Sequence, residues 1–219
     1  MDVARSSQGD GTRPGGLMRL VAAGLTGEGF DVRLPEHEEE RRLLISSQDA
    51  ECTLTVSDWG ETELEYSPRP GQVTDPTRLA DMASVLLSGQ PWDASQAGTR
   101  HGHGGLTLKG IVGLELRTRG MTVVLDVCED EANLDVYADI VATRPGSPDA
   151  GQVRIDDSGS LTWQRDPRHA DGAGGRDGSY IGEAPSLRVI ALDITTTVAD
   201  AMRQTILAES GPVAPSPAS

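Results

Sequence analysis

The stretch TRHGHGGLTLKG places His101 and His103 one residue apart beside several glycines, so it is the first place to look for chemistry. A His-x-His pair can chelate zinc, but a closed zinc site needs about four ligands. The remaining histidines, His37 and His169, lie far away in the sequence. A phosphate-binding P-loop would need a Lys followed by Ser or Thr, which this stretch lacks. We therefore interpret the stretch as a linker with solvent-exposed histidines and expect no metal there.

Two acidic runs, PEHEEERR and DVCEDEAN, offer a second kind of site. The candidate partner-binding residues in them are Glu38, Glu40, Glu129 and Glu131. Clustered carboxylates can attract a basic protein or a cation. Cation binding is the weaker alternative, because one loop rarely supplies enough ligands. The competing interpretation is that both runs are solvated turns between strands.

Trp59 is a further candidate for partner binding, because it falls in VSDWGE, where Asp-x-Gly predicts a turn. An exposed tryptophan at a turn would mark a contact surface. Trp163 aligns with Leu64 in an alternating segment, and we expect it in the core. With three Trp and one Phe, the chain has too few aromatic residues for a nucleic-acid stacking platform.

Signatures of catalysis are missing from the sequence. It contains no Gly-x-Ser-x-Gly, His-Glu-x-x-His, Cys-x-x-Cys or dinucleotide fingerprint. We therefore assign no catalytic residue and no cofactor, and expect a protein that is not an enzyme, although carboxylate pairs leave no local signature. Cys52 and Cys128 are far apart in strand-like segments, which indicates reduced thiols rather than a disulfide framework.

The net charge of −15 limits the classes of partner. Such acidity disfavours nucleic acids and anionic membrane surfaces, and it is compatible with a basic protein partner. No apolar run approaches the roughly 20 residues of a membrane-spanning helix, and the N-terminus does not resemble a secretory signal. We therefore expect a cytoplasmic protein. Lys109 is the only lysine, and this preference for arginine favours a GC-rich genome of the actinobacterial kind.

An internal repeat organises the chain, because residues 17–45 align with residues 108–136 without a gap. The identical pairs are Leu17/Leu108, Val21/Val112, Leu25/Leu116, Gly29/Gly120, Val32/Val123, Leu34/Leu125, Glu38/Glu129, Glu40/Glu131 and Leu43/Leu134. Each segment has apolar residues at helical spacing, then a glycine that stops the helix, then an alternating strand pattern. A chance match would not keep helix, stop and strand in phase.

The repeat predicts which side chains are buried. The first helix would bury Leu17, Leu20, Val21 and Leu25 in one copy and Leu108, Ile111, Val112 and Leu116 in the other. The first strand would bury Phe30, Val32 and Leu34 in one copy and Met121, Val123 and Leu125 in the other.

The alignment continues from residues 56–69 to residues 155–168, each predicting two short strands around an Asp-x-Gly turn. A helix over residues 75–89 should follow, with Asp75 as its N-cap and Pro76 at its first position. Its apolar stripe would be Leu79, Met82, Ala83 and Leu86. Its counterpart opens at Pro185. The sequence thus predicts an α+β fold, a tandem duplication of a helix–antiparallel strands–helix unit.

The predicted organisation has six parts: a disordered N-terminus (1–15), a first α+β repeat (16–89), a linker (90–105), a second α+β repeat (106–209), a Gly-rich insertion within that repeat (168–182) and a disordered tail (210–219). Whether the copies fold separately or share one sheet, and whether the chain forms oligomers, stays open at this point.

This duplicated unit, in an acidic chain with few motifs, resembles the type III secretion chaperone-like fold, including its YbjN-type relatives, over roughly residues 16–209. The resemblance implies that the two units pack as a pseudo-dimer within one chain and bind a polypeptide without chemistry. We therefore predict a non-enzymatic, chaperone-like module that sequesters or escorts a protein partner. One alternative is an immunity or antitoxin-like protein that neutralises a basic toxin. The other is a small-ligand-binding protein or enzyme with a site between the copies.

Overall fold

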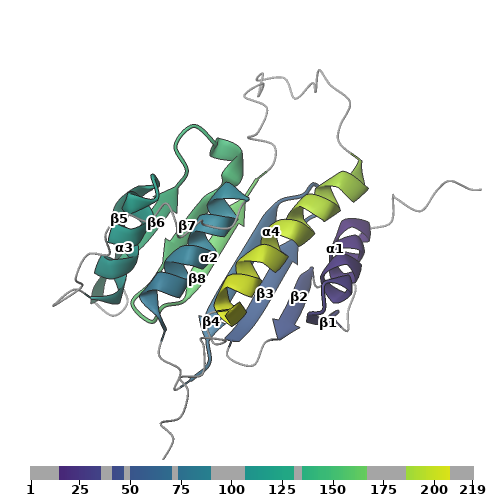
Figure 1. The fold of residues 1–219 in the computed structure, drawn as a ribbon, viewed down its shortest axis with the longest axis horizontal. Helices are drawn as coiled ribbons and strands as arrows, with labels where there is room; N and C mark the ends of the chain where they lie inside the picture. The colour runs from purple at the N-terminus through teal and green to yellow at the C-terminus, as the bar shows by residue number, and fades with distance from the viewer. Residues whose placement is uncertain are drawn as a thin grey trace, which may run out of the picture.

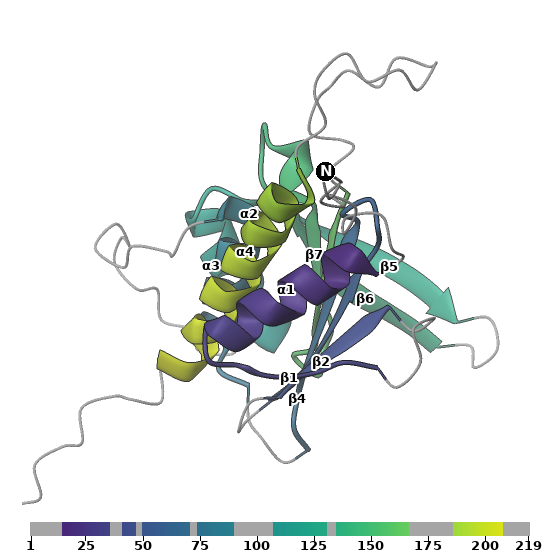
Figure 2. The same ribbon diagram turned by 90° about the vertical axis from the view of Figure 1, so that its right-hand side faces the viewer.

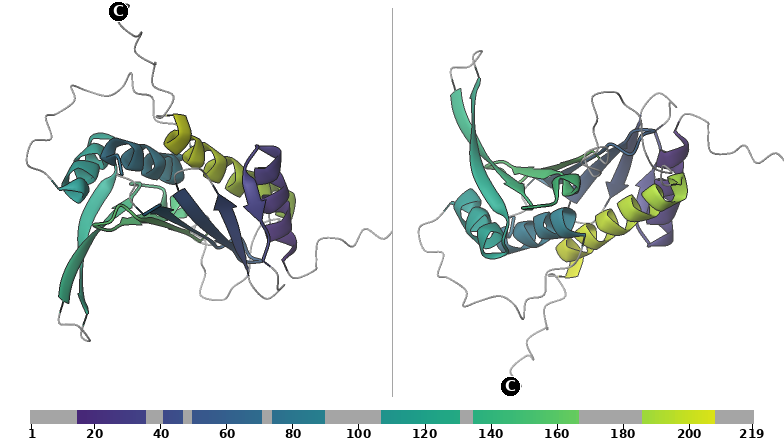
Figure 3. Two further views of the ribbon diagram at one scale, coloured as in Figure 1. Left: turned by 90° about the horizontal axis from the view of Figure 1, so that it is seen from below. Right: turned by 90° about the horizontal axis from the view of Figure 1, so that it is seen from above.

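The computed structural model describes residues 15–35, 41–46, 50–70, 74–89, 107–130, 135–166 and 186–207. In this part of the chain, four α-helices cover one face of an eight-stranded antiparallel sheet and leave the other face uncovered (Figures 1 and 3). The predicted α+β class is confirmed.

Both halves of the chain contain the same series of elements. The first half comprises α1 (Gly16–Gly27), β1 (Asp31–Arg33), β2 (Arg42–Ser46), β3 (Ala50–Val56), β4 (Thr62–Pro68) and α2 (Pro76–Ser88). The second half comprises α3 (Leu108–Thr118), β5 (Thr122–Asp130), β6 (Asp135–Thr143), the short 3-10 helix η2 (Pro148–Ala150), β7 (Gln152–Ile155), β8 (Leu161–Arg165) and α4 (Leu187–Leu207). The helix–four strands–helix order agrees with the predicted repeat, while the duplication itself remains a prediction.

The two halves share one sheet, with the strand order β1-β2-β3-β4-β8-β7-β6-β5. The last strand of each half therefore lies at the centre. In the β4–β8 pair, Leu64 lies directly opposite Trp163, the residue with which it aligns in sequence. If a local twofold axis relates the two halves, two aligned residues must face each other at the centre of this pair of strands. The β4–β8 register meets that condition.

The first helices of the two halves end in the same way. Gly29 has φ 93° and Gly120 has φ 80°, a left-handed conformation that favours glycine. The N–H of Gly29 donates to the carbonyl of Thr26 (3.0 Å), and that of Phe30 donates to the carbonyl of Leu25 (3.1 Å). Gly120 and Met121 repeat both bonds, to Arg117 and Leu116, at 3.0 Å each. These are Schellman motifs, and each leads the chain directly into a first strand.

Local sequence signals also fix α2. The side chain of Asp75 accepts the N–H of Thr77 at 2.8 Å, Pro76 opens the helix, and Gly89 ends it with φ 64°. The predicted apolar stripe of Leu79, Met82, Ala83 and Leu86 is buried. The N-cap, first residue and buried face that we predicted for this helix are confirmed.

The last helix of each half packs against the other half. Helix α2 contacts β7 and β8, and α4 lies beside α1 (Figure 1). The Sδ of Met202 in α4 is 3.2 Å from the Sγ of Cys52 in β3. Trp163 is fully buried, as predicted, and its indole N–H donates to the carbonyl of Ala150 at 3.0 Å. The halves therefore interlock around one hydrophobic core.

Three predicted core residues are wrong, because Leu20, Leu34 and Leu125 are exposed. In α1 the buried face includes Met18 and Ala22, and it leaves Leu20 at its margin. Leu34 lies beyond the end of β1 and is 54% exposed, while Leu125 is 68% exposed. Leu125 is exposed because the long strands β5 and β6 extend past the layer of helices that would cover them (Figure 2).

The N-terminal boundary also needs correction at Gly15, which we assigned to the disordered N-terminus. Its N–H donates to the Oδ1 of Asp58 at 2.9 Å. The rest of that segment, the linker, the Gly-rich insertion and the tail lie outside the described residues.

The closeness of α1 to α4 can be tested at Gly24. A Cβ at this position would lie 2.7 Å from the Oγ1 of Thr195 and 2.8 Å from its Cγ2. Gly24→Ala should therefore destabilise the fold by about 1–3 kcal/mol, measured by guanidinium denaturation. Gly27→Ala, on the same helix with nothing within 4 Å, is the matched control and should be neutral or slightly stabilising. Equal effects of the two changes would contradict the close crossing.

Candidate functional site

The turn between β3 and β4 holds Trp59 in solvent, with its side chain 73% exposed. The Oγ of Ser57 accepts the N–H of Trp59 (3.3 Å) and that of Glu61 (3.0 Å). The N–H of Ser57 donates to the carbonyl of Glu61 at 2.9 Å, and Gly60 has φ 88°. The main chain is thus fixed on both sides of the tryptophan, as the Asp-x-Gly pattern predicted.

The turn between β7 and β8 is built in the same way without a tryptophan. The Oδ1 of Asp156 accepts the N–H groups of Ser158 (2.8 Å) and Ser160 (3.0 Å), and Gly159 has φ 83°. Ser158 occupies the position of Trp59. Because serine suffices for this turn, the indole of Trp59 is not required to form it.

Each turn is tied to the first helix of its own half by an aspartate at the matched position. Asp58 accepts the N–H of Gly15, directly before α1, and pairs with Arg41 at 3.0 Å. Asp157 pairs with Lys109 in the first turn of α3 at 2.8 Å. A carboxylate near a helix N-terminus also interacts favourably with the helix dipole. The turn that carries Trp59 is therefore anchored at its flank as well as internally hydrogen-bonded.

A groove of about 920 Å³ lies beside this turn, where the ends of β4 and β8 meet the loop between β6 and β7. Ser57 and Glu61, which flank Trp59, line it together with Glu63 of β4 and Gln164 of β8. We call this feature the seam groove. It crosses the boundary between the two halves, so both contribute to its walls.

The polar side chains of the seam groove are bonded to other groups of the protein. Arg165 binds the carboxylate of Asp193 (2.6 Å) and the carbonyl of Asp149 (2.9 Å). Arg144 donates to the carbonyl of Ser88 (3.2 Å). The amide of Gln164 donates to Glu63, opposite it in the sheet, at 3.3 Å. These bonds hold the side chains that line the groove in fixed positions.

Much of the two acidic runs lies outside the residues that the structure describes. Glu38, Glu40 and Glu131 lie outside the described residues. Glu129 was predicted in a turn, but it belongs to β5, because that strand continues to Asp130. Strand β5 is one edge of the sheet, and β1, which precedes the first acidic run, is the other.

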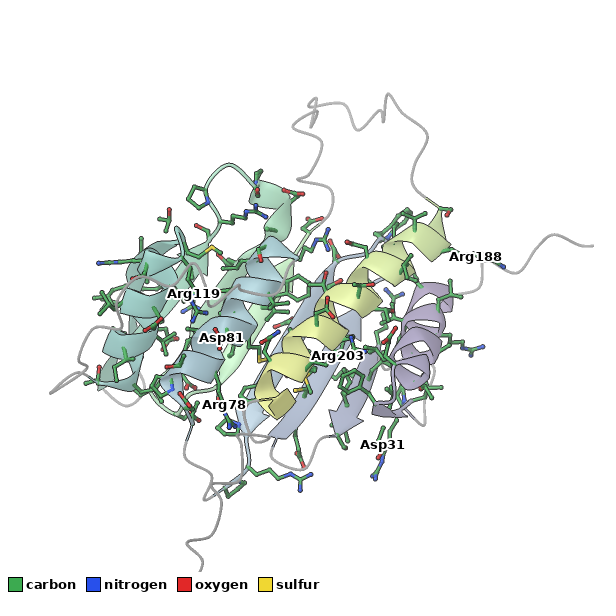
Figure 4. The ribbon with its side chains drawn as sticks, viewed as in Figure 1. Asp31, Arg78, Asp81, Arg119, Arg188 and Arg203 are labelled. Atoms are coloured by element: carbon green, nitrogen blue, oxygen red, sulfur yellow. The ribbon has the colours of Figure 1, made fainter. Side chains whose placement is uncertain are left out.

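An ion pair that the sequence did not indicate joins α2 and α3. The side chain of Arg119 is only 3% exposed and binds Asp81 at 2.7 Å (Figure 4). Burial raises the pKa of Asp81, and the nearby Arg119 acts in the opposite direction. At the position matched to Arg119, Glu28 binds Arg203 of α4. Both pairs link the first helix of one half to the last helix of the other, so we assign them a structural role.

Cys52 is unsuited to nucleophilic chemistry. It is free and buried, and burial raises the pKa of its thiol to about 12, so the reactive thiolate is scarce at neutral pH. Within the described part of the chain, no three His, Cys, Asp or Glu side chains are grouped to hold a metal ion.

No protein-family model matches this chain, and no curated protein or solved structure does either. The similarity to the chaperone-like fold therefore stays a prediction. Among the described helices, none is long and apolar enough to cross a membrane.

The raised pKa of Cys52 predicts a pH dependence of stability. The thiol ionises near 9 in the unfolded chain and near 12 in the folded protein, so the unfolded state loses its proton first. The free energy of unfolding should therefore fall as the pH rises above 9, by up to about 1.4 kcal/mol per pH unit from this group. Cys52→Ala removes this contribution, so its stability deficit relative to wild type should shrink between pH 8 and pH 10 in urea titrations. A deficit that stays constant would contradict the burial of the thiol.

Proposed function

We propose that this protein is a non-enzymatic, chaperone-like module that binds a polypeptide partner through Trp59 and the seam groove. The observation that carries the proposal is the exposure of Trp59 in a fixed turn that does not need it. Tryptophan is among the residues most enriched in the energetic centres of protein interfaces. A main chain that is already ordered loses little entropy when the ring is covered.

The seam groove complements this anchor. An exposed apolar side chain beside a groove that has both apolar surface and internally bonded polar side chains matches the mixed composition of protein interfaces. The net charge of −15 favours a partner with a basic surface, since opposite charges speed association and suppress wrong partners. A basic toxin would meet this description, and the identity of the captured partner decides between escort and neutralisation.

Duplication and cytoplasmic location form part of the same proposal. The matched helix ends, the matched turns and the twofold register of β4 with β8 support an origin by tandem duplication. The composition supports a cytoplasmic protein.

A second candidate function is the binding of a small polar molecule in the seam groove. Its volume of about 920 Å³ lies within the range of small-molecule sites, and it spans both halves. The bonds already made by its arginines and by Gln164 weigh against this candidate, because a ligand would have to displace them.

The test of Trp59 is affinity capture by the full-length tagged protein from native lysate, read by mass spectrometry. Trp59→Ser copies the residue of the matched turn, so it should leave the stability unchanged. It should weaken binding of the captured partner by about thirtyfold, as expected for an interface hot spot of about 2 kcal/mol. Leu192→Ser, at another exposed apolar residue, is the control and should bind as wild type. Equal binding by all three proteins would remove Trp59 from the interface.

The acidic runs have their own test. Reversal of Glu38, Glu40, Glu129 and Glu131 to Lys should slow association with a basic partner and reduce the salt dependence of capture, without loss of the fold. Association rates measured at low and at high salt check this expectation. An unchanged rate at low salt would assign the runs to solvation only.

A further inference from the structure

We propose that β5 is a self-association surface, where it pairs antiparallel with β5 of a second copy of this chain. This surface lies at the edge of the sheet, and the proposal does not depend on the function assigned to Trp59. It starts from three exposed apolar residues on one strand: Val124 is 52% exposed, Leu125 68% and Val127 61%.

The exposed residues continue a face that is buried elsewhere. Val123 packs in the core under the helices, and Leu125 and Val127 follow it on the same face of the strand. Because β5 and β6 project beyond the helix layer, no helix covers these two side chains (Figure 2). A neighbouring strand would extend the sheet and give both side chains cross-strand partners.

The two edges of the sheet differ in their readiness to pair. Strand β1 has three residues and is followed within two positions by Pro35, and short strands and proline both hinder pairing. Strand β5 has nine residues and no proline. An edge strand of this length presents a row of backbone N–H and C=O groups along its outer side. Of the two edges, β5 is therefore the one that can accept another strand.

The sequence of β5 is complementary to itself when it is reversed. Antiparallel pairing centred on Leu125 places Leu125 opposite its own copy and Val123 opposite Val127. This register forms an apolar ladder that continues the core face of the sheet beyond the helices. A register centred on Asp126 would set two like charges directly opposite each other, which is destabilising.

Charge favours the same register. Strand β5 ends in the acidic residues Glu129 and Asp130, and it begins next to Arg117, whose guanidinium donates to the carbonyl of Val123 at 3.0 Å. In the pairing centred on Leu125, Val127 of one copy lies opposite Val123 of the other. Glu129 follows Val127 by two residues, which is about 7 Å along the strand. The acidic end of each strand thus lies near the arginine of the other copy, and Asp126 is already paired with Arg154 of its own chain. This complementarity favours a second copy over an unrelated strand.

The expected dimer is weak. A contact between single edge strands falls at the small end of protein interfaces, about 1,200 Å² or less, where transient association is common. The acidic net charge of each copy opposes association further, and salt reduces that repulsion. We expect a reversible dimer with a dissociation constant in the micromolar range, more stable at 0.3 M than at 0.03 M salt.

Sedimentation velocity of the full-length protein over a range of concentrations tests the proposal. The wild type should shift from monomer to dimer, while Leu125→Lys should stay monomeric. Leu34→Lys is the matched control, because Leu34 is the exposed leucine at the aligned position of the opposite edge, and it should dimerise as wild type. Near-ultraviolet circular dichroism checks that both variants keep the native fold.

A cross-linking experiment fixes the register. In a Cys128→Ser background, Leu125→Cys should form a disulfide-linked dimer under mild oxidation, since directly opposed residues bring their Cβ atoms to about 4.5–5.5 Å. Leu34→Cys in the same background should not. A wild type that stays monomeric at all concentrations and both salt levels, or a dimer that Leu125→Lys leaves intact, would overturn the proposal.

Discussion

The pairing of β4 with β8 is the interaction on which the rest of the structure depends. It joins the last strand of each half into one sheet, with Leu64 and Trp163 fully buried at its midpoint. Because the join is central, α2 can lie over β7 and β8 while α4 lies over β3, and the helices interlock above one core. Without this pairing each half would expose its innermost strand and the apolar face of its last helix. The seam groove exists only because this pairing brings strand ends and loops of both halves together.

Charge on the helices favours the same crossed arrangement. Arg119 ends α3 and binds Asp81 of α2, whereas the matched residue Glu28 ends α1 and binds Arg203 of α4. Each pair therefore binds the end of a first helix to the last helix of the other half. The buried position of Arg119 makes its loss of a partner costly, since an unpaired buried charge is strongly destabilising. The two ion pairs therefore favour the arrangement in which the last helix of each half packs against the first helix of the other half.

The sequence predicted those features that short-range chemistry determines. The caps of α2, the glycines that end α1 and α3, and the turn that exposes Trp59 all depend on residues within a few positions of one another. Long-range packing was less accessible. Alternation along β5 indicated a buried Leu125, but that side chain is exposed, and no local pattern encodes which part of a strand a separate helix will cover. The burial of Arg119 has the same origin, because it depends on a helix from the other half. The alignment of the halves did indicate Trp163 in the core, since it matched Leu64.

The matched turns have a consequence for stoichiometry. The scaffold offers two turns of the same geometry, but one carries Trp59 and the other Ser158. A symmetric pair of subunits would present the tryptophan twice, whereas this chain presents it once. A partner anchored on Trp59 would therefore bind one molecule per chain, with a defined polarity across the pseudo-twofold axis. A symmetric pair of identical subunits would let the partner bind in either of two equivalent orientations, whereas this chain allows only one.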